Sequence, residues 1–177
     1  MDIQVKKDHY FRKKYDDLGR FISYFYQVDT VTDLNPKTIL EVGKGNGMLS
    51  DYLKKLGYQV TTCDFDKNLN PDVVADVRRM PLADNSYEAV TAFEILEHLP
   101  FTDLPVALAE LKRVSSRYVV ISLPYKSTGF ELVFKFPGAR TLFKKLFLNF
   151  FIRIPLKFGG IEVSGQHYWE IDAWNYR

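Results

Sequence analysis

A glycine-rich turn stands where a predicted strand passes into a predicted helix. Its sequence is Glu41-Val-Gly-Lys-Gly-Asn-Gly47, between an apolar stretch at 38–42 and a segment with helical spacing at 48–56. Glycine has no Cβ, so the backbone of such a turn can approach a ligand closely, beside the free N–H groups of the helix N-terminus. The same glycines could serve only to turn the chain tightly. Taken alone, the turn is a weak indication of a nucleotide-like ligand.

An acidic residue follows the next predicted strand. Residues 59–63 are Gln-Val-Thr-Thr-Cys, a β-branched stretch that ends on Asp64. Rossmann-like folds place a carboxylate here to bind the ribose hydroxyls of an adenine nucleoside. Asp64 and Asp66 could also be turn residues. The order of strand, glycine turn, helix, strand and acid nevertheless favours a nucleoside site, because chance rarely produces all of these features together.

The spacing of the glycines separates two kinds of nucleoside-binding protein. A dehydrogenase fingerprint needs Gly-x-Gly-x-x-Gly, and Met48 stands at its last position when counting from Gly43. The observed Glu-x-Gly-x-Gly-x-Gly instead resembles motif I of the class I S-adenosyl-L-methionine (SAM)-dependent methyltransferases. The stretches at 76–90 and Phe93-Glu-Ile-Leu-Glu-His-Leu99 also resemble this family. The resemblance covers about residues 38–124 and is close to the methyltransferase type 11 subgroup.

The resemblance implies transfer of a methyl group from SAM to an unidentified acceptor, with S-adenosyl-L-homocysteine as the product. Nine residues are implied to bind the cofactor: its methionine end by Glu41, Gly43, Gly45 and Gly47, its ribose by Asp64, and its adenine by Phe65, Asp76, Val77 and Phe93. Lys44 departs from the small or apolar residue often found there. It could face solvent or meet the SAM carboxylate, and we expect it to face solvent. Methyl transfer from a sulfonium depends mainly on orientation, so the lack of an obvious catalytic triad is expected.

Three polar residues, Glu94, Glu97 and His98, form a separate candidate site. On a helix the two glutamates would lie about one turn apart. A similar Glu-x-x-Glu-His binds a divalent ion in ubiquinone-pathway O-methyltransferases and small-RNA 2′-O-methyltransferases, and His167 could add a fourth ligand. The alternative is a helix start with acids near its positive end. We expect no metal here and take His98 as the candidate general base.

The remaining elements must position these residues. Strands are predicted at 73–75, 87–92 and 118–122, and an amphipathic helix at 104–114. Strands that alternate with helices predict a doubly wound, Rossmann-like, mostly parallel α/β sheet with helices on both faces. Apolar residues at helical spacing within 8–29 predict a further helix across a core edge. We expect one domain, with a helical cap at 1–37, a SAM-binding core at 38–124 and an insertion at 125–160.

The insertion is basic and aromatic. Residues 130–158 contain eight phenylalanines, six Lys or Arg residues and a single acid, Glu131. Residues 139–154 are predicted to form a helix with a broad apolar side. This helix could pack on the domain, close as a lid over a hydrophobic or anionic acceptor, or contact an anionic membrane surface.

The end of the chain and its composition complete the expectations. The family ends in a strand hairpin that we expect to be missing or truncated here, and the sheet edge so exposed predicts a homodimer. The net charge of +2 and the lack of a known RNA-binding pattern disfavour nucleic acid as a partner and leave a small-molecule acceptor. One cysteine, no apolar leader and no long apolar run predict a cytoplasmic protein.

Two alternative functions remain. One is a SAM-binding module without catalysis that acts through a partner. The other is a NAD-dependent oxidoreductase, which the spacing of the glycines disfavours.

Overall fold

Five parallel strands form the central sheet of the protein. The computed structural model describes residues 7–126, 128–134, 148–154 and 171–172. The strands are β1 (Thr38–Val42), β2 (Gln59–Asp64), β3 (Val73–Val74), β4 (Tyr87–Phe93) and β5 (Ser115–Ser122). Their order is β3-β2-β1-β4-β5, with every neighbouring pair parallel. The chain therefore winds outward from β1 to β3 and returns to β4 on the other side of β1, where ligands of such sheets bind.

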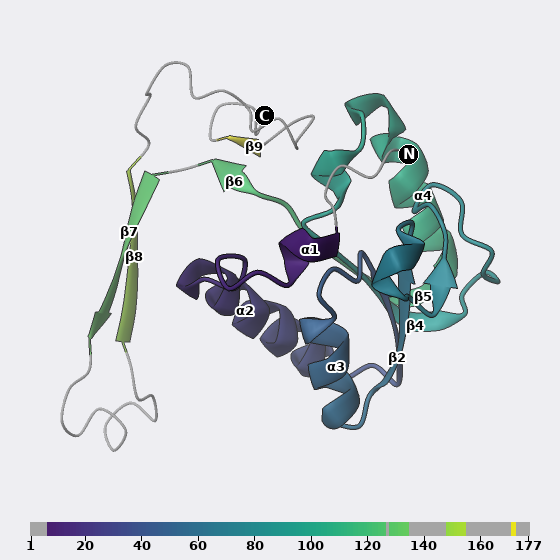
Figure 1. Cartoon of the computed structure of the whole chain (residues 1–177), viewed down its shortest axis with the longest axis horizontal. Coiled ribbons are helices and arrows are strands. Elements are labelled where there is room, and N and C mark those ends of the chain that lie inside the picture. Colours follow the sequence, from purple (N-terminus) through teal and green to yellow (C-terminus); the bar gives the residue numbers. More distant parts are fainter. Residues whose placement is uncertain (1–6, 127, 135–147, 155–170, 173–177) are drawn as a thin grey trace. The chain divides into compact units, whose positions relative to one another are not determined.

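Helices cover both faces of this sheet (Figure 1). They are α1 (Lys7–Tyr10), α2 (Leu18–Leu34), α3 (Met48–Lys55) and α4 (Leu104–Val114), with short 3₁₀ helices η1 (Lys67–Leu69), η2 (Leu96–His98) and η3 (Phe101–Asp103). The side chain of Asp17 caps α2 by accepting a hydrogen bond from the Arg20 N–H at 2.9 Å. Asn35 ends the same helix in a left-handed conformation.

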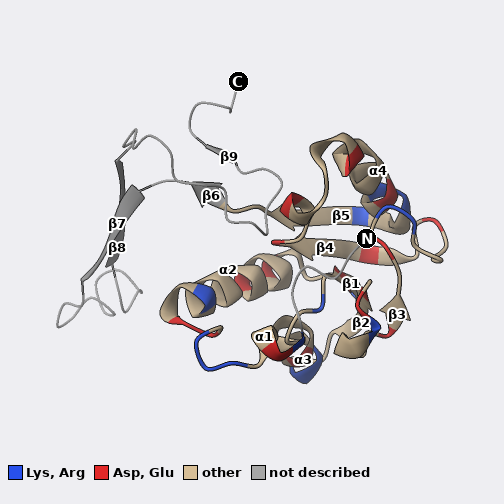
Figure 2. Ribbon diagram, turned by 45° about the horizontal axis from the view of Figure 1, so that its top comes forward, with Lys and Arg blue, Asp and Glu red and all other residues tan. Residues whose placement is uncertain are grey.

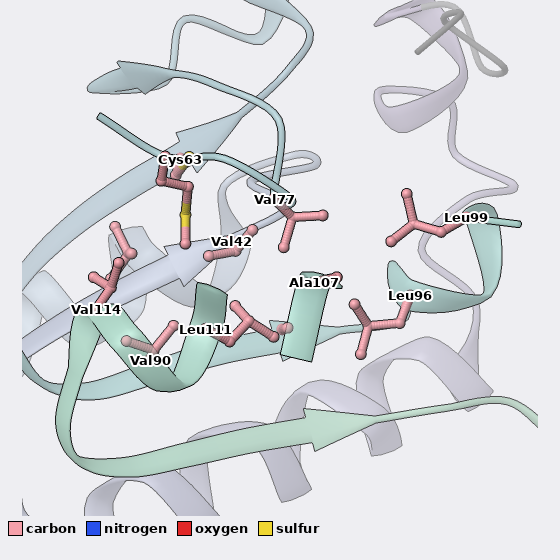
Figure 3. Packing of buried hydrophobic residues seen from close by; sticks show 12 residues of the cluster. Val42, Cys63, Val77, Val90, Leu96, Leu99, Ala107, Leu111 and Val114 are labelled. Atoms are coloured by element: carbon pink, nitrogen blue, oxygen red, sulfur yellow. The ribbon is translucent and has the colours of Figure 1, made fainter. Parts of the chain in front are cut away.

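Successive side chains along each strand pack against opposite faces of the sheet. In β1, Ile39 packs with Leu53 of α3 and Val31 of α2, whereas its neighbour Leu40 packs with Leu111 of α4. Successive strand residues point to opposite faces, so one strand contributes to two hydrophobic clusters. Figure 3 shows the cluster under α4, where the side chains of the helix meet those of β1 and β4.

The predicted fold class is confirmed. The strand at 38–42 and the helix at 104–114 have the bounds that the sequence predicts, while β5 begins three residues earlier than expected, at Ser115. The agreement is close because these elements combine a strong apolar period with clear breakers at their ends.

The helix predicted at 139–154 is wrong over its last part. Residues Leu148–Ile154 form strand β8, which pairs antiparallel with β7 (Thr128–Phe134). An apolar run of this kind fits either structure, and aromatic and β-branched residues such as those at 150–154 favour a strand once a backbone partner is available. Residues 135–147, also part of the predicted insertion, lie outside the described residues.

The described residues beyond Leu123 belong to a second compact unit. It contains β7, β8 and a short parallel pair of β6 (Tyr125–Lys126) with β9 (Ile171–Asp172), and the first unit contains residues 7–123. The role of this unit as a lid stays a prediction. His167 and the residues after 172, where the missing hairpin is expected, lie outside the described residues. Among the helices that the structure describes, none has the length and apolar character to cross a membrane.

Candidate functional site

Position 43, in the turn after β1, requires glycine for two separate reasons. Its φ is +87°, in the left-handed region that side chains disfavour. A Cβ built on Gly43 would lie 2.3 Å from Cγ2 of Ile95, in the segment after β4. The Gly43 N–H also donates to the Cys63 carbonyl at 2.8 Å, so the turn stays attached to β2. The backbone is therefore held close to the ends of both neighbouring strands.

A cavity of about 280 Å³ lies at the carboxyl ends of β1, β2 and β4. Eight of the ten residues predicted for the site line it: Glu41, Gly43, Gly45, Asp64, Phe65, Val77, Phe93 and His98. These residues come from four separate stretches of the sequence. The parallel sheet brings them together because the carboxyl ends of its strands meet at one edge.

Two predicted residues, Gly47 and Asp76, do not line the cavity. Gly47 is the N-cap of α3 and has a φ of +79°. Asp76 accepts from the backbone N–H and from Nε of Arg78, both at 2.9 Å, and Arg78 also pairs with Asp103. The Arg78 guanidinium holds the pKa of the Asp76 carboxyl below its usual range. Their contacts with a cofactor stay predictions.

Two buried carboxyl groups give the cavity its electrostatic character. Glu41 is 5% exposed, and burial raises its pKa to about 8, against the opposing effects of Ser50 and Lys44. Its Oε2 atom is buried without a hydrogen-bond partner in the part of the chain that the structure describes. Burial also raises the pKa of Asp64, whose Oδ1 accepts from the Asp66 N–H at 2.9 Å. A cationic group entering the cavity would offset the cost of ionising Glu41.

The segment with Glu94, Glu97 and His98 lines the cavity in a different geometry from the one expected. Glu94 has a φ of +54° and precedes η2, so the two glutamates do not share a helical face. Oε1 of Glu94 accepts from the Ser122 hydroxyl at 2.8 Å. Both oxygens of Glu97 are buried without a hydrogen-bond partner among the described residues, and burial raises its pKa to about 7. The described part of the chain contains no group of three or more His, Cys, Asp or Glu residues that could hold a metal ion.

The sequence-based prediction misses an aromatic group from the N-terminal segment that also lines the cavity. Its members are His9, Tyr10, Tyr15, Arg20 and Tyr24. The Tyr10 and Tyr15 rings meet edge to face at 5.3 Å, and the Arg20 guanidinium carbon lies 4.0 Å from the centre of the Tyr15 ring. The enrichment of residues 8–29 in aromatic and charged side chains was the available signal, but local sequence does not say which surface they cover.

Asn46, in the middle of the glycine turn, anchors this N-terminal segment. Its Oδ1 accepts from the Tyr24 hydroxyl at 3.2 Å, and its Nδ2 donates to Asp16 at 3.1 Å. Its neighbour Lys44 is half-buried, and Nζ donates to the Asn70 carbonyl at 2.6 Å. This exposed hydrogen bond joins the turn to the loop after η1.

Comparisons with known proteins agree with this geometry. Residues 40–121 match the model of a family described as a methyltransferase domain. This match covers a little under half of the chain and shows that it is similar to the class I methyltransferases. The resemblance drawn from the glycine spacing is therefore confirmed, with SAM as the cofactor of the family, and neither the NAD-dependent oxidoreductase nor the non-catalytic module is favoured.

Curated proteins that are similar to this chain are named ubiquinone biosynthesis O-methyltransferases. The one from Xanthomonas oryzae pv. oryzae is 35% identical over 116 residues, which cover 56% of this chain and 48% of the relative. The one from Bordetella parapertussis is 32% identical over 87 residues, covering 41% and 36%. The chain spans about half the length, or less, of these relatives.

Solved structures show the same fold. A SAM-dependent methyltransferase from Aquifex aeolicus is 22% identical with a TM-score of 0.52, and the match covers 67% of this chain and 72% of that one. The magnesium protoporphyrin IX methyltransferase from Synechocystis, solved with bound SAM, is 17% identical with a TM-score of 0.55, covering 70% and 78%.

A first prediction concerns Gly43. Gly43→Ala should lower the affinity for SAM at least about tenfold, because the new Cβ forces the turn away from Ile95 and adds left-handed strain of roughly 1–2 kcal/mol. Isothermal titration with SAM measures the effect. Gly57→Ala is the matched control, since Gly57 has a φ of +96° with no atom within 4 Å of an added Cβ, and it should keep wild-type affinity. Wild-type affinity in Gly43→Ala would contradict the argument.

A second prediction concerns the pH dependence of stability. Burial raises the pKa of Glu41 from 4.5 to about 8, so between these values the folded protein holds a proton that the unfolded chain has released. The free energy of unfolding without cofactor should therefore fall as the pH rises from about 4.5 to 8, and Glu41→Gln should make this fall smaller. Glu97, whose pKa burial raises to about 7, accounts for part of the fall that remains. Urea unfolding at a series of pH values measures it.

Glu110 provides the control for the pH experiment. Its hydrogen bond with Arg113 lowers its pKa, so its contribution is present above the unfolded-state value and is lost as the pH falls. Glu110→Gln should change the profile only below a pH of about 4.5. The same slope between pH 4.5 and 8 in wild type and in Glu41→Gln would show that Glu41 is not its source.

Proposed function

We propose that this chain binds SAM in the described cavity and transfers its methyl group to a hydroxyl of a small-molecule acceptor. The observation that carries the proposal is that the glycine turn and Asp64 line the same cavity. This cavity lies where the strand order of a class I methyltransferase sheet reverses, between β1 and β4. The hydroxyl as acceptor is suggested by the O-methyltransferases named among the relatives.

The residues present fit the methionine end of SAM. Glu41 has a buried carboxyl oxygen without a partner among the described residues, which suits the ammonium group. Arg20 lines the same cavity, and no carboxylate in the part of the chain with defined side chains lies within ion-pair distance of it. A guanidinium binds a carboxylate with charge-assisted hydrogen bonds. We assign Glu41 to the ammonium group of SAM and Arg20 to its carboxylate.

Residues at the ends of the neighbouring strands are assigned to the nucleoside end of SAM. The Asp64 carboxylate, at the end of β2, is assigned to the ribose hydroxyls. Phe65 and Val77 offer apolar surface to the adenine, and the Phe93 carbonyl stands at the end of β4. When bound, SAM supplies an electrophilic methyl group on a sulfonium. The protein's own contribution is then to hold the acceptor oxygen in line with that methyl group.

Proton transfer is assigned to the segment after β4. A hydroxyl that accepted the methyl group would have to lose its proton. His98 lines the cavity and is our candidate to accept that proton.

We also infer that the reaction occurs in the cytoplasm, in keeping with the single free cysteine, Cys63. The homodimer through a sheet edge and membrane contact by residues 130–158 remain predictions.

A third prediction tests the assignment of Arg20. Arg20→Met should weaken SAM binding about 10- to 100-fold, since hydrogen bonds to charged groups contribute roughly 1.5–3 kcal/mol. Binding of 5′-methylthioadenosine, which lacks the carboxylate, should be unchanged. Arg117→Met is the matched control, because the Arg117 guanidinium also lies over a tyrosine ring, that of Tyr118, but does not line the cavity. An equal loss for both ligands would contradict the assignment.

A fourth prediction tests the reaction itself. With SAM carrying a labelled methyl group and a pool of phenols and catechols, the chain should produce S-adenosylhomocysteine and a labelled ether in equal amounts, measured by mass spectrometry. Titration with SAM, S-adenosylhomocysteine and NAD provides the binding control. Binding of NAD but of neither sulfur nucleoside would overturn the proposal, and SAM binding without turnover on any acceptor would favour a non-catalytic module.

A further inference from the structure

The outer face of α2 carries a row of exposed apolar side chains. Leu18 is 78% exposed, Phe21 48%, Phe25 62% and Tyr26 51%. Leu18, Phe21 and Phe25 follow one another at spacings of three and four residues and so share one side of the helix, and Tyr26 flanks them. Val31, on the opposite side, is fully buried in the core. The helix α2 therefore carries apolar residues on both of its sides. A contiguous exposed apolar surface of this kind is a mark of an interaction site.

A basic loop precedes this face directly. Arg12, Lys13 and Lys14 are exposed, and among the residues with defined side chains no carboxylate lies within 4.0 Å of them. The acids that follow are engaged elsewhere: Asp16 accepts from Asn46, and Asp17 caps α2. Figure 2 shows the basic stretch in blue in the loop between α1 and α2, followed by the acidic residues in red at the start of α2. Cations thus lie at the edge of the apolar row.

We propose that residues 11–26 dock on an anionic phospholipid membrane. Exposed aromatic and aliphatic side chains enter the boundary between headgroups and acyl chains, and adjacent Lys and Arg residues are attracted to anionic headgroups. Phe11, 61% exposed, extends the apolar row into the basic loop. Asp29 and Asp33, exposed further along the same side of α2, mark where the surface ends. The helix therefore approaches the membrane with its N-terminal half.

Charge favours a membrane over a second copy of the chain as the occupant. A two-fold dimer buries the same patch of both copies in one interface. Both basic loops would then lie beside that interface, and repulsion between them would oppose association. An anionic membrane instead neutralises all three cations at once.

Docking would bring the cavity to the membrane surface. Tyr15, Arg20 and Tyr24 line the cavity and belong to the same segment as the exposed row. A hydroxyl acceptor with an apolar tail, held in the bilayer, would then lie near the methyl donor. This last step rests on the proposed function, whereas the docking itself does not.

Vesicle co-sedimentation of the full chain tests the proposal. Binding is expected to phosphatidylglycerol vesicles and much less to phosphatidylcholine vesicles. Replacing Arg12, Lys13 and Lys14 together by Gln should weaken binding on the order of a hundredfold at low salt, about fivefold for each charge. Phe21→Ser with Phe25→Ser should also weaken it severalfold. Val106→Ser is the matched control, because Val106 is 55% exposed on α4, and it should leave binding unchanged.

Several outcomes would overturn the docking surface. These are equal binding by the wild type and the charge variant, an equal loss in Val106→Ser, or a loss caused only by Lys144→Gln with Lys145→Gln in the second unit. A dimer in light scattering that Phe25→Ser dissociates would make a second copy the occupant. A lower melting temperature in Phe25→Ser with unchanged vesicle binding would mean that protein covers this face.

SAM titration of the same variants separates this proposal from the proposed function. The exposed residues replaced in the test do not line the cavity, so SAM affinity should stay at the wild-type value even where vesicle binding is lost. If the protein binds vesicles but no SAM, the proposed function is wrong, whereas the proposed docking surface is supported.

Discussion

The close approach of the Gly43 backbone to Ile95 is the constraint on which the site depends. It joins the end of β1 to the segment after β4, and the hydrogen bond from the Gly43 N–H to Cys63 joins the same turn to β2. Three strand ends are thereby held around one cavity. Any side chain at position 43 would separate them, because close-packed interiors do not yield by more than a few tenths of an ångström without cost.

The carboxyl groups around the cavity oppose stability and favour function. Glu41 and Glu97 have buried oxygens without partners among the described residues, and their raised pKa values, about 8 and about 7, express the cost of charge in that surrounding. Structural carboxylates such as Asp76 and Glu110 lie beside arginines, which lower their pKa values. Among the side chains that the structure describes, the buried acids without partners thus all line the cavity, where a cationic ligand can satisfy them.

The N-terminal segment performs two tasks through the two sides of one helix. Toward the cavity, Tyr24 binds Asn46 of the glycine turn, which ties the segment to the SAM site. Toward the outside, Phe21 and Phe25 remain exposed. A helix with apolar residues on both sides needs a second partner for its outer side, and the membrane surface that we propose fits the adjacent cations.

The sequence by itself determined the glycine turn, the acid at the end of β2, the order of strands and helices, and hence the resemblance to the class I methyltransferases. These features are local, since backbone conformation at a glycine or the period of a short strand depends on neighbouring residues. Only the tertiary structure decided that Arg78 binds Asp76, that Glu94 lies outside a helix, that Leu148–Ile154 is a strand, and that Arg20 and Tyr10 line the cavity. Each of these outcomes depends on a partner distant in sequence or on backbone geometry imposed by packing, and local patterns carry no information about either.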